Sequence, residues 1–153
     1  MGKNLEELIE GIRRDKKAYV DSHVDLADFY FGAQKYEEAL ESLDKAIELD
    51  SENGIIWNNK GHTLWEIGRY EEALESLDKA IELNPENGII WNNKGRTLGE
   101  MGRYEEALES LDKAIELDPE NGIIWNNKGF ALERSGRYEE ALESLDKAIE
   151  LDP

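Results

Sequence analysis

Apolar residues return at steps of three and four through most of the chain. In segment 70–83, the apolar side chains fall on one helical face: Tyr70, Ala73, Leu74, Leu77, Ala80, Ile81 and Leu83. Upstream, a second stripe is formed by Ile56, Trp57, Leu64 and Ile67. The first stripe ends before Pro85 and the second ends at Gly68, and both residues are typical helix stops. The pattern therefore predicts two amphipathic helices joined by a short turn.

This pair of helices repeats every 34 residues, as the tryptophans at 57, 91 and 125 show. The units are 54–87, 88–121 and 122–153. A further unit, 20–53, shares the segment YEEALESLDKAIEL but differs over its first half. Residues 5–12 imitate the start of a second helix, so we expect residues 1–19 to form an N-terminal half-repeat that caps the array.

Glycine and asparagine mark the turns. Gly68, Gly102 and Gly136 follow the first helix of each unit, where a residue with positive φ ends a helix without strain. Pro-Glu-Asn-Gly separates the units at 85–88 and 119–122. Asn-Gly often marks a β-hairpin, but both flanks have helical periodicity, which argues against strands.

The repeated residues Trp57, Gly61, Ala73, Ala80 and Pro85 resemble the pattern of the tetratricopeptide repeat, and the resemblance covers residues 20–153. Leu64 and Leu77 stand where this family usually has aromatic residues. This resemblance implies an all-α fold, a right-handed superhelical α-solenoid of antiparallel helix hairpins. First helices would line a concave groove and second helices would form the convex back. A single hairpin cannot bury its apolar face, so we expect stacked neighbours, with Trp57 buried between units.

Some positions depart from the family pattern. Lys60, Lys94 and Lys128 stand where the family usually has leucine. We expect their alkyl stems to pack and their ammonium groups to reach water. On the second helices we expect ion pairs between residues four apart, such as Glu75 with Lys79.

The net charge of −18 argues against binding to duplex nucleic acid or to anionic membranes. No apolar run is long enough to cross a bilayer, and the first ten residues lack the apolar core of a signal peptide. The chain has no cysteine, which excludes disulfides and thiolate metal sites. We expect a cytoplasmic protein.

Differences between the units fall mainly in the second half of each first helix. By resemblance to the family, the groove-facing positions there include His62, Trp65, Glu66, Arg96 and Phe130. Two interpretations stay open. These side chains contact different parts of one ligand, or they vary because packing does not constrain them. An exposed indole at position 65 would favour the first interpretation slightly, and the alternative is that Trp65 packs on its own neighbours.

Constant amides form a second candidate set in the groove: Asn58, Asn59, Asn92, Asn93, Asn126 and Asn127. In the family the second asparagine of such a pair often holds the backbone of a bound peptide. Alternatively, these amides bond neighbouring helices or water. Lysines that grip a terminal carboxylate in one family variant are absent here, so we predict no carboxylate clamp. Asp21, Asp25 and Asp28 instead favour a basic or neutral partner segment.

Catalytic and cofactor motifs are not evident. The two histidines, His23 and His62, lie in different units without an accompanying metal motif, and we find no phosphate loop or nucleophile elbow. We therefore expect no enzyme, no metal and no cofactor.

The sequence favours a non-catalytic protein-protein interaction scaffold that binds a peptide segment in its concave groove. One alternative is a structural protein that self-associates through its last unit, which lacks a polar capping helix around Leu142, Leu145 and Ile149. Another is an engineered repeat protein without a natural ligand, because units 54–87 and 88–121 are nearly identical.

Overall fold

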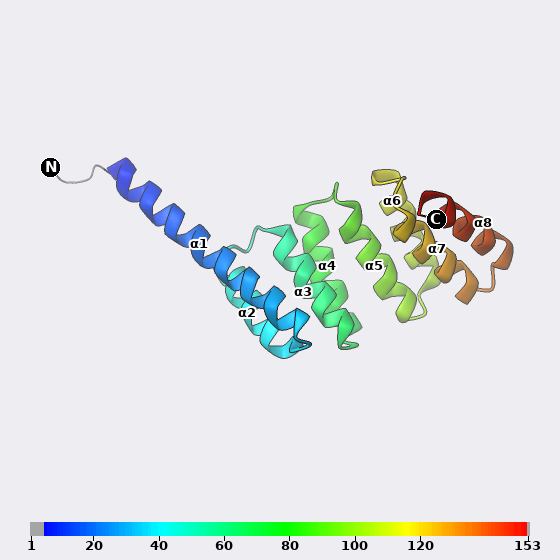
Figure 1. Ribbon diagram of the computed structural model, residues 1–153, viewed down its shortest axis with the longest axis horizontal. Coiled ribbons are helices and arrows are strands. Elements are labelled where there is room, and N and C mark those ends of the chain that lie inside the picture. The colour runs from blue at the N-terminus through cyan, green and yellow to red at the C-terminus, as the bar shows by residue number, and fades with distance from the viewer. Residues whose placement is uncertain (1–4, 153) are drawn as a thin grey trace.

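The structure is a computed structural model that describes the backbone of residues 5–152 and the side chains of residues 13–152. The described residues form eight helices and no strand. The helices are α1 (Leu5–Gly32), α2 (Tyr36–Leu49), α3 (Gly54–Glu66), α4 (Tyr70–Leu83), α5 (Gly88–Glu100), α6 (Tyr104–Leu117), α7 (Gly122–Arg134) and α8 (Tyr138–Leu151). They follow one another along a single long axis, with α1 and α8 at opposite ends (Figure 1).

Each helix packs against the next one in the chain, and the tightest contacts lie within the pairs α1–α2, α3–α4, α5–α6 and α7–α8. The first helices of successive pairs also touch, α3 with α5 and α5 with α7. Contacts confined to each pair and its neighbouring pairs are typical of a solenoid. The prediction of an all-α solenoid built from helix hairpins is confirmed.

Helix α1 is twice as long as the others and passes through the expected boundary at Val20 without a turn. Residues 12–31 contain neither glycine nor proline, so nothing in the sequence stops the helix there. Its N-terminal half projects beyond α2 (Figure 1). The division into a half-repeat at 1–19 and units at 20–53, 54–87, 88–121 and 122–153 stays a prediction.

Positive backbone φ angles occur at the turns inside the pairs. Gly68, Gly102 and Gly136 have φ of 75°, 75° and 82°. In the first pair the same place is taken by Gln34, with φ of 58°. A side chain in this left-handed region costs about 1–2 kcal/mol, so the first turn is strained where the later ones are not.

Asparagine side chains cap the N-termini of the first helices in the later pairs. The Oδ1 atoms of Asn53, Asn87 and Asn121 accept hydrogen bonds from the backbone N–H two residues on, at 3.1, 3.0 and 3.2 Å. These bonds satisfy an N–H group that the helix itself leaves unpaired. The Asn-Gly sequence therefore caps a helix rather than closing a β-hairpin.

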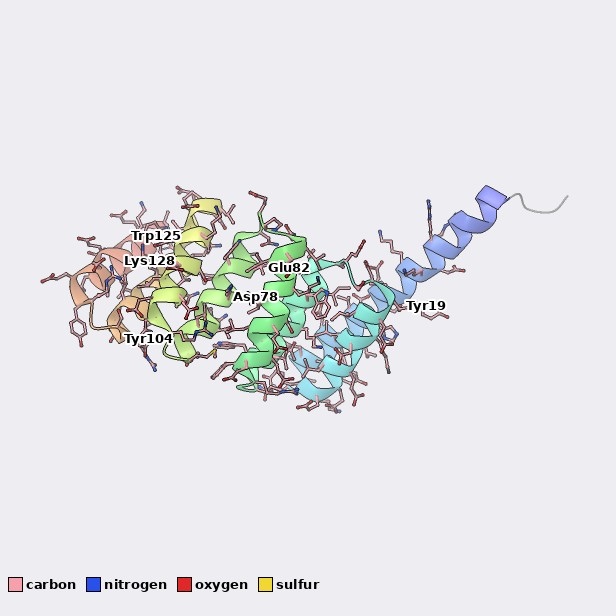
Figure 2. The ribbon with its side chains drawn as sticks, turned by 180° about the vertical axis from the view of Figure 1, so that it is seen from behind. Tyr19, Asp78, Glu82, Tyr104, Trp125 and Lys128 are labelled. Carbon is pink, nitrogen blue, oxygen red and sulfur yellow. The ribbon has the colours of Figure 1, made fainter. Side chains whose placement is uncertain are left out.

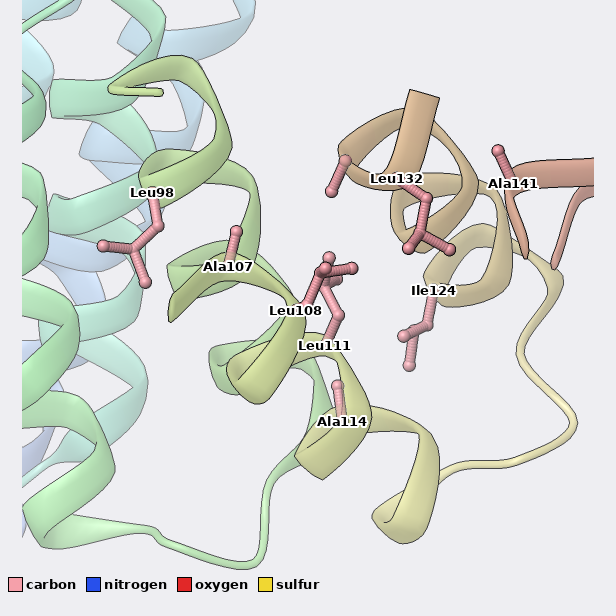
Figure 3. Close-up of a cluster of buried hydrophobic side chains, with 9 residues drawn as sticks. Leu98, Ala107, Leu108, Leu111, Ala114, Ile124, Leu132 and Ala141 are labelled. Atoms are coloured by element: carbon pink, nitrogen blue, oxygen red, sulfur yellow. The ribbon is translucent and has the colours of Figure 1, made fainter. Parts of the chain in front are cut away.

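The core lies between the pairs. One cluster joins Leu98 of α5, Leu111 and Ala114 of α6, and Ile124 and Leu132 of α7 (Figure 3). Small residues allow this close packing. A Cβ added to Gly95 would lie 2.6 Å from Leu111 Cγ, and Gly61 and Gly129 meet the equivalent leucines at 2.7 Å.

The tryptophans at 57, 91 and 125 are half-buried, not fully buried as expected. Their rings pack beside the core, as Trp57 does against Leu77, Ala80 and Ile90. Each Nε1–H donates a hydrogen bond at 2.8–2.9 Å to the carbonyl oxygen of Ser51, Pro85 or Pro119. Each indole therefore holds the loop that precedes its helix against that helix.

The expectation that the ammonium groups of Lys60, Lys94 and Lys128 reach water is corrected by the structure. Their Nζ atoms lie 2.7 Å from Asp44, Asp78 and Asp112 on the preceding second helix, so the ammonium groups are paired rather than free in water. They also lie 5.7–5.8 Å from the centroids of the neighbouring tryptophan rings. Figure 2 shows one such neighbouring pair, Trp125 and Lys128, on α7. The carboxylate opposite each lysine explains how a cation is accommodated between units.

Ion pairs on the second helices also differ from the prediction. Lys79 reaches Glu82 at 2.9 Å, three residues on, instead of Glu75. Lys113 and Lys147 likewise pair with the glutamate three residues on. Residues three apart share a helix face as well as residues four apart do, and the free choice of rotamer decides between them.

Candidate protein-binding groove

The candidate groove residues come from equivalent places on α3, α5 and α7, which contact one another in succession. His62, Arg96 and Phe130 stand one unit apart. Their neighbouring positions hold Trp65 on α3 and Gly99 on α5. The periodicity of the solenoid therefore gathers these side chains on one side of the array.

Planar side chains form a row from α1 to α5, which we call the aromatic row: Phe31, His62, Trp65 and Arg96. The rings of Phe31 and His62 are 5.1 Å apart, and those of His62 and Trp65 are 6.3 Å apart and nearly parallel at 28°. The guanidinium carbon of Arg96 lies 4.0 Å from the Trp65 ring centroid. A cation over an indole face is a favourable contact, so the row links three helix pairs.

The pKa of His62 depends on its place in this row. Burial lowers its pKa below the usual 6.5, and the nearby Arg96 lowers it further. Glu66, whose Oε1 lies 3.4 Å from His62 Nε2, opposes this shift without cancelling it. The imidazole is therefore mainly neutral at physiological pH.

A pocket of about 290 Å³ opens beyond the row, between α3, α5 and α7, and we call it the Gly99 pocket. It is lined by Trp65, Gly95, Arg96, Gly99, Glu100, Tyr104, Asn127, Phe130, Ala131 and Arg134. Arg134 Nε donates to the Tyr104 hydroxyl at 3.5 Å, and this contact raises the pKa of Arg134. Tyr104 is at the start of α6 (Figure 2). The pocket combines aromatic rings with two guanidinium groups.

A smaller hollow of about 220 Å³ lies on the other side of the row, toward α1. It is lined by Ala27, Asp28, Phe31, Leu43, Asn59, His62 and Thr63. Its charged side chain is Asp28, whereas the Gly99 pocket has two arginines and one glutamate. The groove thus changes from acidic to basic along the array.

The paired asparagines form a ladder between units. Asn93 Nδ2 donates to Asn58 Oδ1 at 2.9 Å, and Asn127 Nδ2 donates to Asn92 Oδ1 at 2.8 Å. These four amides bond neighbouring helices, which is the second of the two interpretations of the asparagine pairs. Contact between a peptide backbone and Asn93 or Asn127 stays a prediction.

The remaining two amides lie at the ends of the ladder. Asn59 has no ladder partner because Val24 stands where the preceding unit would supply an asparagine. It lines the smaller hollow with His62. Asn126 lies apart from the groove hollows, beside Ile123, Leu145 and Ile149 at the α8 end.

Sequence reasoning identified Trp65, Arg96, Asn127 and Phe130 of the Gly99 pocket but missed several of its lining residues. Gly99, Glu100 and Arg134 differ between units, so the comparison that selected Arg96 pointed to them as well. Tyr104 is the same residue in every unit and gave no such signal. Phe31 of the smaller hollow lies in the divergent first unit, which has no near-identical copy for comparison.

Within the described residues, no three histidine, cysteine or acidic side chains gather as metal ligands would. None of the helices in this part of the chain is long and apolar enough to cross a membrane.

Comparison with known proteins agrees with this geometry. Family profiles described as "Tetratricopeptide repeat" match residues 52–120 and 92–153, and one described as "TPR repeat" matches residues 27–68. No curated protein gives a significant match.

Solved structures give close matches to the fold. MamA AMB-1 is 31% identical, with a TM-score of 0.77 over 87% of this chain and 79% of that one. A MamA structure from Desulfovibrio magneticus RS-1 is 23% identical, with a TM-score of 0.79 over 88% and 76%.

YrrB, described as a TPR protein with an unusual peptide-binding site, is 27% identical, with a TM-score of 0.76 over 98% of this chain and 82% of that one. Proteins of this family are generally non-catalytic interaction modules, and the fold supports a protein-protein interaction scaffold. The chain belongs to the tetratricopeptide repeat family.

Proposed function

We propose that the chain binds a segment of a partner protein along α3, α5 and α7, without catalysing a reaction. The proposal rests on one observation: residues that differ between the repeat units lie where aromatic and arginine side chains are accessible to a ligand. Units 54–87 and 88–121 differ at four positions, and two of these, His62 to Arg96 and Trp65 to Gly99, belong to the aromatic row and the Gly99 pocket. Phe130, on the rim of that pocket, is 51% exposed. Exposed aromatic and arginine side chains are the residue types that dominate protein interfaces.

Charge along the groove favours an orientation for the partner. Asp28 lines the hollow toward α1, and Glu66 lies beside His62. A basic or neutral part of the partner segment suits this end of the groove, because an acidic one would be repelled. At the other end of the groove, the two arginines of the Gly99 pocket favour an acidic part of the partner segment.

Calorimetric titration with peptides selected from a random display library tests the proposal. We expect micromolar binding to the wild type and at least a tenfold loss of affinity in Phe130→Ala with Arg96→Ala, because both side chains line the pocket. The matched control is Lys79→Ala with Lys113→Ala on the second helices. Equal binding by both double variants, or failure to select any peptide, contradicts the proposal.

A second candidate is self-association through α8. Leu142 is 62% exposed, whereas the equivalent Leu108 of α6 is 6% exposed beneath α7. Ile149 is 64% exposed on the same helix. We propose a symmetric pairing of α8 with α8 of a second copy, because a two-fold interface joins the same exposed surface of each copy.

Light scattering over a concentration series tests this pairing. We expect a dimer at high concentration for the wild type and a monomer for Leu142→Lys, which places a charge on the pairing surface. A strictly monomeric wild type refutes this candidate and leaves the groove proposal intact.

A further inference from the structure

Gly99 is unusual among the helical glycines of the array. It is the penultimate residue of α5, and a Cβ added there would meet no atom within 4 Å. Gly95, one turn earlier, is instead required by the close approach of Leu111. A glycine inside a helix destabilises it by about 1 kcal/mol relative to alanine. Packing of the chain therefore gives no reason for Gly99.

The preceding unit shows what belongs in the empty space. Trp65 is the equivalent residue of α3, and its ring stacks on Arg96, the residue 31 positions further on. Counting the same interval from Gly99 leads to Phe130. The glycine leaves open the place that the indole fills one unit earlier, and the Gly99 pocket occupies that place with Phe130 on its rim.

The charges around the pocket indicate what should accompany an aromatic ring. Arg69, Arg103 and Arg137 each bind a glutamate three residues on. Within the described part of the chain, no carboxylate lies within ion-pair distance of Arg96 or Arg134, although acidic residues outnumber basic ones two to one. Arg134 donates to the Tyr104 hydroxyl and Arg96 lies on the Trp65 ring, and neither contact neutralises the guanidinium charge, so both groups can still pair with an acidic residue of a ligand.

We infer that the Gly99 pocket receives one aromatic side chain of the partner segment, which takes the place that Trp65 takes in the preceding unit. An acidic residue next to that ring pairs with Arg134 or Arg96. The inference rests on the proposed function, because it names the chemistry of the segment that the groove binds. A pocket of about 290 Å³ holds one side chain and is at the small end for a separate small-molecule ligand.

The substitution Gly99→Trp tests the inference by letting the protein fill its own pocket. The open space at this position and the Trp65 precedent predict a folded variant with unchanged helicity. Glu133→Trp is the matched control, because position 133 is equivalent on α7 but does not line the pocket. Arg134→Gln tests the acidic contact separately.

The probes are peptides selected from a random display library on the full wild-type chain, with blocked termini so that no terminal carboxylate takes part. Affinity is measured by calorimetry. We expect selected peptides to share an aromatic residue beside an acidic one. Gly99→Trp should weaken binding at least tenfold, Arg134→Gln by about threefold to tenfold, and Glu133→Trp by less than twofold.

The outcomes separate this inference from the function on which it rests. If peptides bind the groove but lack an aromatic residue, or bind Gly99→Trp as tightly as the wild type, the inference is wrong and the groove proposal stands. If an aromatic residue is selected without an acidic neighbour and Arg134→Gln has no effect, the acidic part is wrong. If no peptide binds the wild type, both fail.

Discussion

Two glycines one turn apart in α5 have opposite consequences for stability. We predict that Gly95→Ala lowers the free energy of unfolding by about 1–3 kcal/mol, because its new methyl group would overlap Leu111. Gly99→Ala should raise it by up to about 1 kcal/mol, because the new methyl group meets open space and the last turn of the helix gains propensity. Urea denaturation of both variants measures the difference. Changes of the same sign in both would contradict the assigned packing.

His62 gives the molecule a pH dependence near neutrality. Its pKa is lower in the folded chain than the usual 6.5, so the unfolded chain binds the proton more readily. The contribution of His62 to the free energy of unfolding is therefore fully present above about pH 6.5. It is lost as the pH falls toward the lowered pKa of His62 in the folded chain. Asp28 on α1, Glu66 on α3 and Arg96 on α5 are the charged groups that surround it.

We predict that the wild type loses more stability between pH 7 and pH 5 than His62→Gln does, measured by urea denaturation at each pH. The three glutamates whose pKa is shifted by an arginine are present in both chains, so the comparison between the two isolates His62. Arginine partners lower the pKa of Glu72, Glu106 and Glu140 below the usual 4.5. Parallel curves for the wild type and the variant would show that His62 is not the group that titrates.

Single residues of the groove were only partly predictable from the sequence. Comparison between units selected Arg96 and Phe130 because they stand at positions that change. It could not show that Arg96 lies on Trp65 or that Arg134 reaches Tyr104, because these contacts depend on side-chain rotamers across two units. It also could not place both partners of the asparagine ladder, since periodicity alone does not fix where an amide points.

At the scale of helices and turns, apolar periodicity and glycine predicted the later pairs well. The three glycines after α3, α5 and α7 adopt positive φ as expected. The first pair was harder to predict, because α1 continues through the expected boundary and its turn uses Gln34. Ion pairs on the second helices were also missed, since their spacing allows two partners of similar energy.

The turn between α1 and α2 offers a stabilising substitution. Gln34→Gly should raise the free energy of unfolding by about 0.5–1 kcal/mol, because relief of the left-handed strain exceeds the entropy that glycine adds to the unfolded chain. The reverse change, Gly102→Ala, should destabilise the chain at the equivalent turn of the third pair. Thermal and urea denaturation measure both. A destabilised Gln34→Gly would mean that the glutamine side chain makes a stabilising contact.

At the scale of the whole molecule, the array presents two different surfaces. Second helices carry paired charges, such as Arg103 with Glu106 and Lys113 with Glu116. First helices carry the aromatic row and the two hollows. Charges already paired within the chain contribute little to binding, whereas aromatic groups and arginines without a carboxylate partner contribute much. The groove side is therefore the face that we assign to the partner.

Chemical-shift mapping of a library-selected peptide on the isotope-labelled chain tests this assignment most directly. We predict that the largest changes fall on first-helix residues, including the Trp65 indole N–H and the backbone amides of Arg96 and Phe130. Amides of the second helices, such as Glu75 and Glu109, should change little. Changes confined to the second helices or to α8 would contradict the account of the groove.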